Sequence, residues 1–129
     1  SMSTLVTANV SDGTDTVGTE YVVNGSAKAY QFTDTDSAII VLVESFNVSS
    51  ITDASSGQLN VNYTNAFADA NFIEIASMQL SVGTGSGAFL PSVVTTATRT
   101  ASKSRIDANQ QGTGNFGRQL STASFGDLA

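Results

Sequence analysis

The stretch from Ser45 to Phe72 carries the clearest hydrophobic pattern in the chain, and this pattern predicts a β-hairpin. Successive side chains of a strand point to opposite faces, so alternation produces one apolar and one polar face. The second strand alternates in this way, with Leu59, Val61 and Tyr63 on one face and Asn60, Asn62 and Thr64 on the other. In the first strand, Phe46 and Val48 are in phase but Ile51 is not, which predicts a bulge near Ser49-Ser50.

Small polar residues from Asp53 to Gly57 separate the two strands and predict a tight turn. An isolated hairpin is only marginally stable in water, so its apolar face requires further strands packed against it. The hairpin therefore predicts a larger β-structure built around Leu59, Val61 and Tyr63.

Further short runs of β-branched and aromatic residues predict the remaining strands. Tyr30 and Phe32 share one face of the first run, and the most apolar run, Ala38–Val43, is expected to be buried on both faces. In the run Phe72–Val82, either Ile73 and Ile75 or Met78, Leu80 and Val82 are expected to point inward, with a slip near Ala76-Ser77. With turns between the runs and no helical period, the pattern predicts an all-β fold, an antiparallel β-sandwich of jelly-roll-like or Ig-like type. The predicted strands are Ala27–Phe32, Ala38–Val43, Phe72–Val82, Leu90–Arg99, Ser102–Asn109 and Asn115–Ala129.

The first 25 residues are expected to form an extended N-terminal arm, and residues 26–129 the sandwich domain. Thr4–Thr7 and Thr19–Val23 are short β-prone runs, Ser11–Asp15 is a turn signal, and Asn24-Gly25 favours a hairpin turn. The scattered valines of this segment cannot form a core within one chain. We therefore expect the arm to be ordered by contacts with a neighbouring subunit.

The composition excludes several kinds of chemistry. The chain has no Cys and no His, so thiolate, zinc and Ser–His chemistry lack their ligands or bases. It also has no Trp, the strongest sugar-stacking side chain. Residues 1–80 hold nine acidic residues against Lys28 alone, a balance that opposes nucleic acid binding. The basic residues of Arg99–Arg105 suggest a head-to-tail contact with an acidic neighbour, although a merely soluble surface is the alternative.

Carboxylates offer few candidates for a site. The pairs Asp12 and Asp15, and Asp34 and Asp36, could each give oxygens to calcium, but neither matches a calcium-binding loop, and solvated turns are the simpler interpretation. No spacing selects a glycosidase pair among the remaining candidates, which are Glu44, Asp53, Asp69 and Glu74. We expect no catalytic residue, no metal and no cofactor.

Three tyrosines are the candidates for contact with a glycan. Tyr21, Tyr30 and Tyr63 could line a sugar site, although half-buried strand positions are the alternative interpretation. The N-terminal residues lack the basic region and long apolar run of a signal peptide, and no stretch is long and apolar enough to be a membrane helix, so we expect neither.

Three separated motifs resemble a family of small structural proteins and fibre tips of tailed, especially marine, bacteriophages. The central motif is Ser-Phe-Asn-Val-Ser-Ser-Ile-Thr-Asp at 45–53 followed by Val-Asn-Tyr-Thr at 61–64. Upstream, residues 10–17 and 21–29 are similar to the openings of such proteins, and Phe125–Ala129 is similar to their endings. The chain departs from the family at 29–36, where members often carry an aromatic-rich Ala-Trp-Val-Asn-Phe-Asn segment.

The resemblance implies a non-enzymatic virion structural protein of the tail-fibre or receptor-binding tip type. It also implies a homotrimer that assembles in the host cytoplasm, contacts other virion proteins and binds a host surface glycan. A capsid decoration or head-fibre protein is the alternative within this family. A carbohydrate-binding module is the alternative from another class, and neither nucleic acid nor a membrane is an expected partner.

Overall fold

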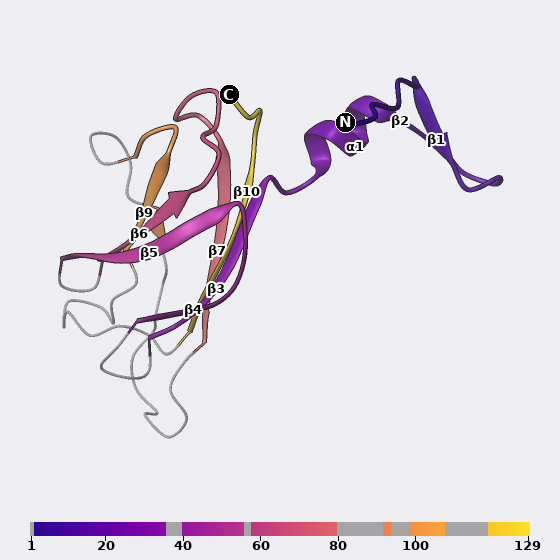
Figure 1. Cartoon of the computed structure of the whole chain (residues 1–129). Helices are drawn as coiled ribbons and strands as arrows, with labels where there is room; N and C mark the ends of the chain where they lie inside the picture. The colour runs from indigo at the N-terminus through magenta and orange to yellow at the C-terminus, as the bar shows by residue number, and fades with distance from the viewer. Residues whose placement is uncertain (1, 36–39, 56–57, 80–91, 94–98, 108–118) are drawn as a thin grey trace.

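The computed structural model describes residues 2–35, 40–55, 58–79, 92–93, 99–107 and 119–129 (Figure 1). Within these residues, two antiparallel four-stranded sheets form a sandwich, which confirms the predicted all-β class. The first 25 residues form a separate small unit that extends away from the sheets in Figure 1.

The first sheet, called sheet I here, has the strand order β4-β3-β10-β7. Its last strand in the sequence lies in the middle, because β10 pairs with β3 on one side and with β7 on the other. All three pairings in the sheet are antiparallel. The strands are β3 (Ala29–Asp34), β4 (Val41–Phe46), β7 (Ile73–Gln79) and β10 (Gln119–Phe125).

The second sheet, called sheet II, has the order β5-β6-β9-β8 and contains the predicted hairpin. The register of β5 against β6 shifts between Val48 and Ser50, which confirms the bulge expected there. Residues 56 and 57 of the predicted turn lie outside the described residues. The strands are β5 (Val48–Ser55), β6 (Gln58–Tyr63), β8 (Ser92–Val93) and β9 (Lys103–Asp107).

The chain crosses from sheet I to sheet II at Asn47, which has a φ of 55°. Asparagine tolerates this left-handed conformation better than most residues. Its side chain holds the crossing, because Nδ2 donates to the carbonyls of Lys28 and Asn65, and Oδ1 accepts from the Asn65 amide at 2.7 Å. Phe46 and Val48, predicted on one strand face, therefore belong to different sheets, with Phe46 exposed and Val48 buried.

Sheet II supplies most of the large side chains of the core. Leu59, Val61 and Ile106 are fully buried, as alternation predicted for the first two. Two phenylalanines from the connection between β6 and β7 complete the cluster: the rings of Phe67 and Phe72 stack with centroids 4.3 Å apart. The predicted core around the hairpin is thus confirmed.

Sheet I is oriented opposite to the prediction. Its buried inward positions carry mostly small or polar side chains, among them Gln31, Thr33, Thr122 and Ser124. Ile73 and Ile75, one of the two sets expected inward on β7, are 67% and 61% exposed. The expectation of a strand at 38–43 buried on both faces is also wrong where it can be judged, since Val41 and Val43 are exposed.

The large apolar residues of sheet I face outward because side chains from sheet II and its exit loop already fill the interior. Large rings from sheet II and its exit loop reach across to sheet I, and the Tyr63 hydroxyl lies 3.0 Å from Ser124 Oγ on β10. Close-packed interiors leave no space for a second layer of large residues at such a position. Small inward residues on sheet I therefore fit, and the alternation of a strand places its large residues outside.

The arm contains a hairpin and a short helix. The hairpin of β1 (Asn9–Ser11) and β2 (Thr16–Gly18) confirms the turn signal at Ser11–Asp15, and no strand forms over Thr4–Thr7. Helix α1 (Thr19–Gly25) corrects the expectation of a β-prone run closed by a hairpin turn.

Local hydrogen bonds account for this helix. Ser26 Oγ donates to the carbonyl of Val22, and Lys28 Nζ donates to the carbonyls of Val23 and Ser26. Carbonyls at the end of a helix lack partners within it, and a nearby ammonium also favours the negative end of the helix dipole. These contacts outweigh the low helix propensity of the two valines.

The remaining predictions agree with the described residues. Strand β9 lies within 102–109 and β10 within 115–129, as expected. Tyr30 and Phe32 occupy the same, outward face of β3. Of the strand expected at 90–99, the structure describes β8 and Arg99, which is not in a strand. Residues 90–91 and 94–98 lie outside the described residues, as do Leu80 and Val82 of the strand expected at 72–82.

We expect Val61→Asp to abolish folding, because it places a charge without a partner at a fully buried position. Asn62→Asp, one residue along the strand, should remain folded. It removes the hydrogen bonds that Asn62 Nδ2 donates to Ser50 and Thr52, at a cost of about 1 kcal/mol. Thermal melting checks both variants, and equal melting temperatures would contradict the assigned strand faces.

Candidate functional site: the apolar outer face of sheet I

A row of apolar side chains crosses all four strands on the outward face of sheet I. Tyr30 pairs with Phe46 on one side and with Ala123 on the other, and Ala123 pairs with Ile75. The rings of Tyr30 and Phe46 stack with centroids 5.7 Å apart, and both are about half exposed. Such a row would normally form one wall of a core.

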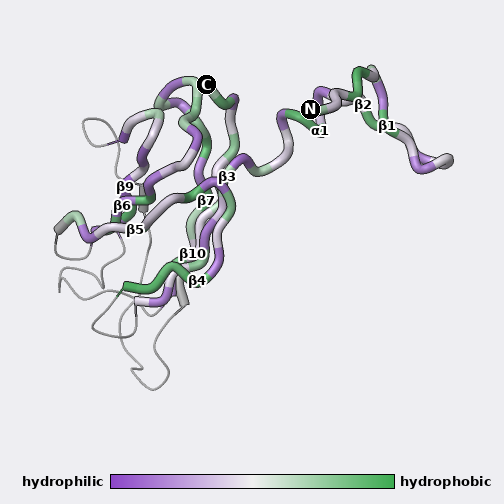
Figure 2. Tube along the Cα trace, viewed as in Figure 1, coloured by the Kyte–Doolittle hydropathy of each residue, from purple (hydrophilic) through white to green (hydrophobic). Residues whose placement is uncertain are grey.

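Neighbouring residues widen this row into a patch. Ile73 lies next to Ile75 on the same face of β7 and pairs with Phe125. The strand β4 adds exposed valines near its bulge, and Figure 2 shows the hydrophobic colour along this strand. We call the patch the apolar outer face, and it comprises Tyr30, Val41, Val43, Phe46, Ile73 and Ile75.

The size of the apolar outer face is unusual for a surface that meets only water. Six large side chains that are each about half exposed present on the order of 500 Å² of apolar area. The largest apolar patch of a typical monomeric protein is ~300–600 Å², and it is often functional. The face therefore ranks as a candidate interaction surface.

The arm carries a second exposed apolar surface. Leu5 and Val6 are 85% and 90% exposed, and Tyr21 and Val23 on α1 are also exposed. Figure 2 shows hydrophobic segments on both the hairpin and the helix. The segment 26–28 joins the arm to the sandwich, and Asn24 at the end of α1 lines a pocket with sandwich residues. In Figure 1 the rest of the arm points away from sheet I. The chain thus has two apolar surfaces that lie apart.

A buried polar cluster of four residues joins the two sheets: Tyr63, Glu74, Ser104 and Ser124. The Tyr63 hydroxyl donates to Glu74 Oε2 at 3.2 Å, and Ser104 Oγ donates to Glu74 Oε1 at 3.0 Å. The Ser124 hydroxyl lies 3.0 Å from the Tyr63 oxygen, and Ser104 Oγ lies 3.3 Å from it. The cluster links β6 and β9 to β7 and β10.

Burial sets the protonation of this cluster. Burial raises the pKa of Glu74, while hydrogen bonds from Ser104 and Tyr63 and the charge of Arg99 act in the opposite direction. Burial, with the nearby Glu74 charge, raises the pKa of Tyr63 to about 12. Tyr63 therefore stays protonated at neutral pH and acts as a donor.

Arg99 closes the cluster from one side. Its guanidinium lies over the Phe72 ring, with Cζ 3.9 Å from the centroid, and donates to the Phe72 carbonyl. A cation over an aromatic face is attracted by the ring quadrupole. The arrangement fixes the position where the chain enters β7, and with it the inward direction of Glu74.

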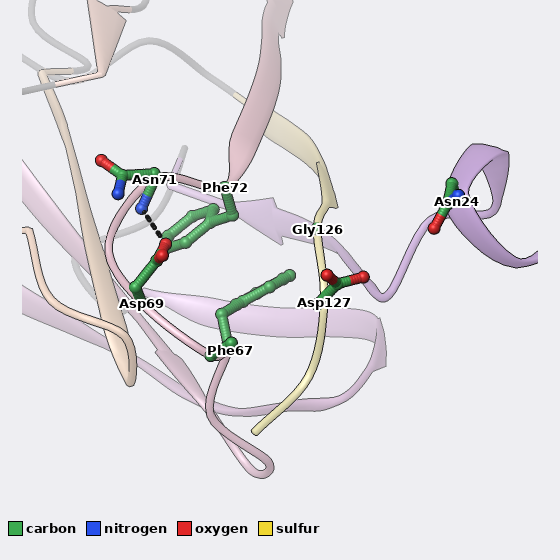
Figure 3. A pocket seen from close by; sticks show the side chains of 8 residues that line it. Asn24, Phe67, Asp69, Asn71, Phe72, Gly126 and Asp127 are labelled. Carbon is green, nitrogen blue, oxygen red and sulfur yellow. Dashed lines mark hydrogen bonds between the residues drawn. The ribbon is translucent and has the colours of Figure 1, made fainter.

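A polar pocket of about 290 Å³ lies at the end of the sandwich nearest the arm (Figure 3). Asp69, Asn71 and Asp127 contribute its polar groups, and the Asn71 amide donates to Asp69 Oδ1 at 2.7 Å. Phe67 and Phe72 also line it but are almost fully buried, so their rings are not available for stacking. The hydrogen bond between Asn71 and Asp69 closes a loop beside the pocket. We assign the pocket no ligand.

Of the carboxylates predicted as possible metal ligands, Asp12 acts in a turn and Asp34 ends strand β3. Asp12 Oδ1 accepts hydrogen bonds from the amides of Thr14 and Asp15, both at 2.9 Å, and these bonds lower the pKa of Asp12. Asp36 lies outside the described residues. Within the described residues, no group of three or more His, Cys, Asp or Glu side chains could hold a metal ion.

The four acids considered for glycoside hydrolysis lie on different elements. Glu44 on β4, Asp53 on β5 and Asp69 after β6 are exposed, whereas Glu74 points into the interior. A glycosidase needs two carboxylates facing each other across a sugar. The inward orientation of Glu74 separates it from the three exposed acids.

The three candidate tyrosines occupy different environments. Tyr21 is exposed on α1, Tyr30 lies in the apolar outer face, and Tyr63 is buried with its hydroxyl in the polar cluster. A surface glycan has no access to the ring of Tyr63. The structure therefore does not bring the three tyrosines together in one site.

Alternation analysis missed the apolar outer face because it assigned the larger residues to the core. A usable signal was nonetheless present in the sequence. Gln31 and Thr33 on β3 alternate with the aromatic residues Tyr30 and Phe32. A strand with large polar or hydroxyl residues on one face and aromatic residues on the other leaves the direction of the sheet open.

Comparison with known proteins adds no family. No family model matches the chain, and no curated protein or solved structure matches it significantly. In the described part of the chain, no helix is long and apolar enough to cross a membrane.

We expect the stability of the protein to depend on pH through Glu74. The ordinary pKa of this side chain is 4.5 and its pKa in the folded state is raised, so the unfolded chain releases the proton first. The contribution of Glu74 to stability therefore falls as pH rises through this window. Glu74→Gln should gain free energy of unfolding relative to the wild type between pH 4 and pH 7.

Denaturant titrations at the two pH values measure this difference. The variant Glu44→Gln, at an exposed position of β4, serves as the matched control and removes the effect of changing the net charge. A difference between Glu74→Gln and wild type that stays constant from pH 4 to pH 7 would contradict the buried, destabilised carboxylate.

Proposed function

We propose that this chain is a non-enzymatic structural subunit of a tailed bacteriophage virion, of the tail-fibre or receptor-binding tip type, and that it functions as a homotrimer. The observation that carries the assembly part is the exposed apolar outer face of sheet I. The phage part rests on the three sequence motifs, and the arrangement of those motifs in the fold supports it.

The central motif and the first upstream motif each correspond to a structural unit, whereas residues 21–29 run from α1 to the start of β3. Residues 45–53 and 61–64 build the crossing at Asn47 and the strands β5 and β6, which carry the core. Residues 10–17 form most of the arm hairpin. These units are the ones on which the folding and the proposed attachment of the subunit depend.

The C-terminal motif packs against the loop that follows the hairpin. The Ala68 amide donates to the Asp127 carbonyl at 2.7 Å, and the Ala129 amide donates to the Ala66 carbonyl. A Cβ at Gly126 would lie 2.9 Å from Phe72 Cβ, so only glycine allows this close approach. The motif Phe-Gly-Asp-Leu-Ala therefore has a packing role next to the buried rings.

Trimer formation supplies burial that one chain lacks. The interior of sheet I is largely polar, so a single chain leaves much of its apolar area outside its own core. Small cores of this kind are commonly completed by oligomerisation. The number three comes from the resemblance to phage fibre modules.

The absence of catalysis is part of the proposal. The chain has no His and no Cys, and the most buried acid, Glu74, has both carboxylate oxygens engaged in hydrogen bonds within the cluster. Tyr63 accounts for one of these bonds and Ser104 for the other. These contacts favour a role of Glu74 in joining the sheets.

Immunogold electron microscopy of purified virions tests the location. Gold at the tail tip is the expected result, whereas gold on the head would assign the chain to the capsid decoration or head-fibre alternative. The absence of label from intact virions would contradict the virion role and favour a carbohydrate-binding module.

We expect light scattering of the purified protein to give about three times the chain mass of 13.3 kDa. Deletion of residues 1–24 should lower the mass of the assembly or its melting temperature, because it removes the exposed apolar residues of the arm. A monomer that is equally stable with and without the arm would contradict the proposal.

A further inference from the structure

We infer that helix α1 of one copy packs on the apolar outer face of sheet I in a second copy. The inference rests on the proposed self-assembly and names the surfaces that form it. It follows from the segment 26–28 that joins arm and sandwich, from the exposed apolar residues of α1 and the outer face, and from the area that each surface exposes.

The segment 26–28 directs most of the arm away from its own sandwich. Lys28 Nζ donates to the carbonyls of Val23 and Ser26, and Asn47 Nδ2 donates to the Lys28 carbonyl. Both side chains hold the segment 26–28, which leads directly into β3. In Figure 1 this segment carries α1 beyond the end of sheet I. The helix is therefore presented outward to a neighbour.

Helix α1 has the surface of an element that is buried in its final state. Tyr21, Val22 and Val23 are consecutive residues and so point to more than one side of the helix, and all three are exposed. A helix with apolar residues on several sides is typical of a buried position. Glu20 is its one charged residue.

The outer face presents apolar side chains of different sizes to a neighbour. The small Ala123 on β10 lies between two larger residues, Tyr30 on β3 and Ile75 on β7. Phe125 lies on the same face of β10 and pairs with Ile73. These residues form a continuous surface against which the apolar side chains of α1 can pack.

The areas also fit a second copy. The outer face and the arm each expose on the order of 500 Å² or more of apolar surface. If every copy gives one arm and receives another, each arm-to-face contact buries about 500 Å² on each partner, or about 1,000 Å² in total, which reaches the ~1,000 Å² that a biological interface needs. A dimer joined face to face would leave the apolar residues of both arms in water.

A contact between two different surfaces closes into a ring when its rotation allows. Arm-to-face packing is such a contact, because α1 and sheet I are distinct parts of the chain. It is therefore compatible with the proposed trimer, in which each arm reaches the next subunit and the third arm returns to the first.

Site-directed crosslinking tests the inference, since the chain has no native cysteine. Two chains with different mass tags, one carrying Val22→Cys and the other Ile75→Cys, are co-expressed, purified and treated with a short bis-maleimide. The matched control replaces Ile75→Cys with Thr52→Cys, an exposed position on β5 of sheet II. Circular dichroism confirms that each variant is folded.

We expect the mixed arm-to-face product to form at least about tenfold faster than the control product, because α1 and the outer face of different copies are in contact. Crosslinking between two Ile75→Cys chains, without the mixed product, would overturn the inference in favour of a face-to-face contact. In that case an assembled mass in light scattering would leave the proposed self-assembly intact. A monomeric mass would overturn both.

Discussion

The interior between the two sheets is filled mainly by large side chains from sheet II and from the connection that follows β6. Leu59, Val61 and Ile106 are fully buried on the strands of sheet II, and Phe67 and Phe72 add two stacked rings. Apart from Leu120, which is fully buried on β10, the buried positions of sheet I carry small or polar side chains. Because side chains alternate along a strand, its larger apolar residues then face outward. The exposed apolar face of sheet I is thus a consequence of how the core is filled.

The polar cluster maintains this arrangement. Tyr63 extends from β6 toward sheet I, and its hydroxyl reaches Glu74 on β7 and Ser124 on β10. Buried polar groups are costly unless they are hydrogen-bonded, so the cluster favours the one register in which these partners meet. A shift of one residue along β7 would place Ile75 inside and break the hydrogen bonds of Glu74 with Tyr63 and Ser104. The inward direction of Glu74 and the outward direction of Ile75 are therefore coupled.

The sequence predicted the features that depend on local pattern. Alternation along β6 located the core, the phase change near Ser49-Ser50 located the bulge, and the fold class followed from short strands between turns. Sequence reasoning did not predict the direction of sheet I, because Ile73 and Ile75 look like core residues until the space opposite them is known to be filled. It also missed α1, whose β-prone residues become helical through contacts from Ser26 and Lys28. The glycan-contact tyrosines are placed apart, and any glycan site stays a prediction.

The central claim is that assembly covers the apolar outer face. Hydroxyl-radical footprinting with mass spectrometry measures this directly, because aromatic side chains such as Tyr30 and Phe46 react when water reaches them. The account predicts that both residues are protected in the concentrated protein and become reactive on dilution, whereas exposed Met2 reacts equally under both conditions. Equal and high reactivity of Tyr30 and Phe46 at all concentrations would show that the face stays in water and would contradict the account.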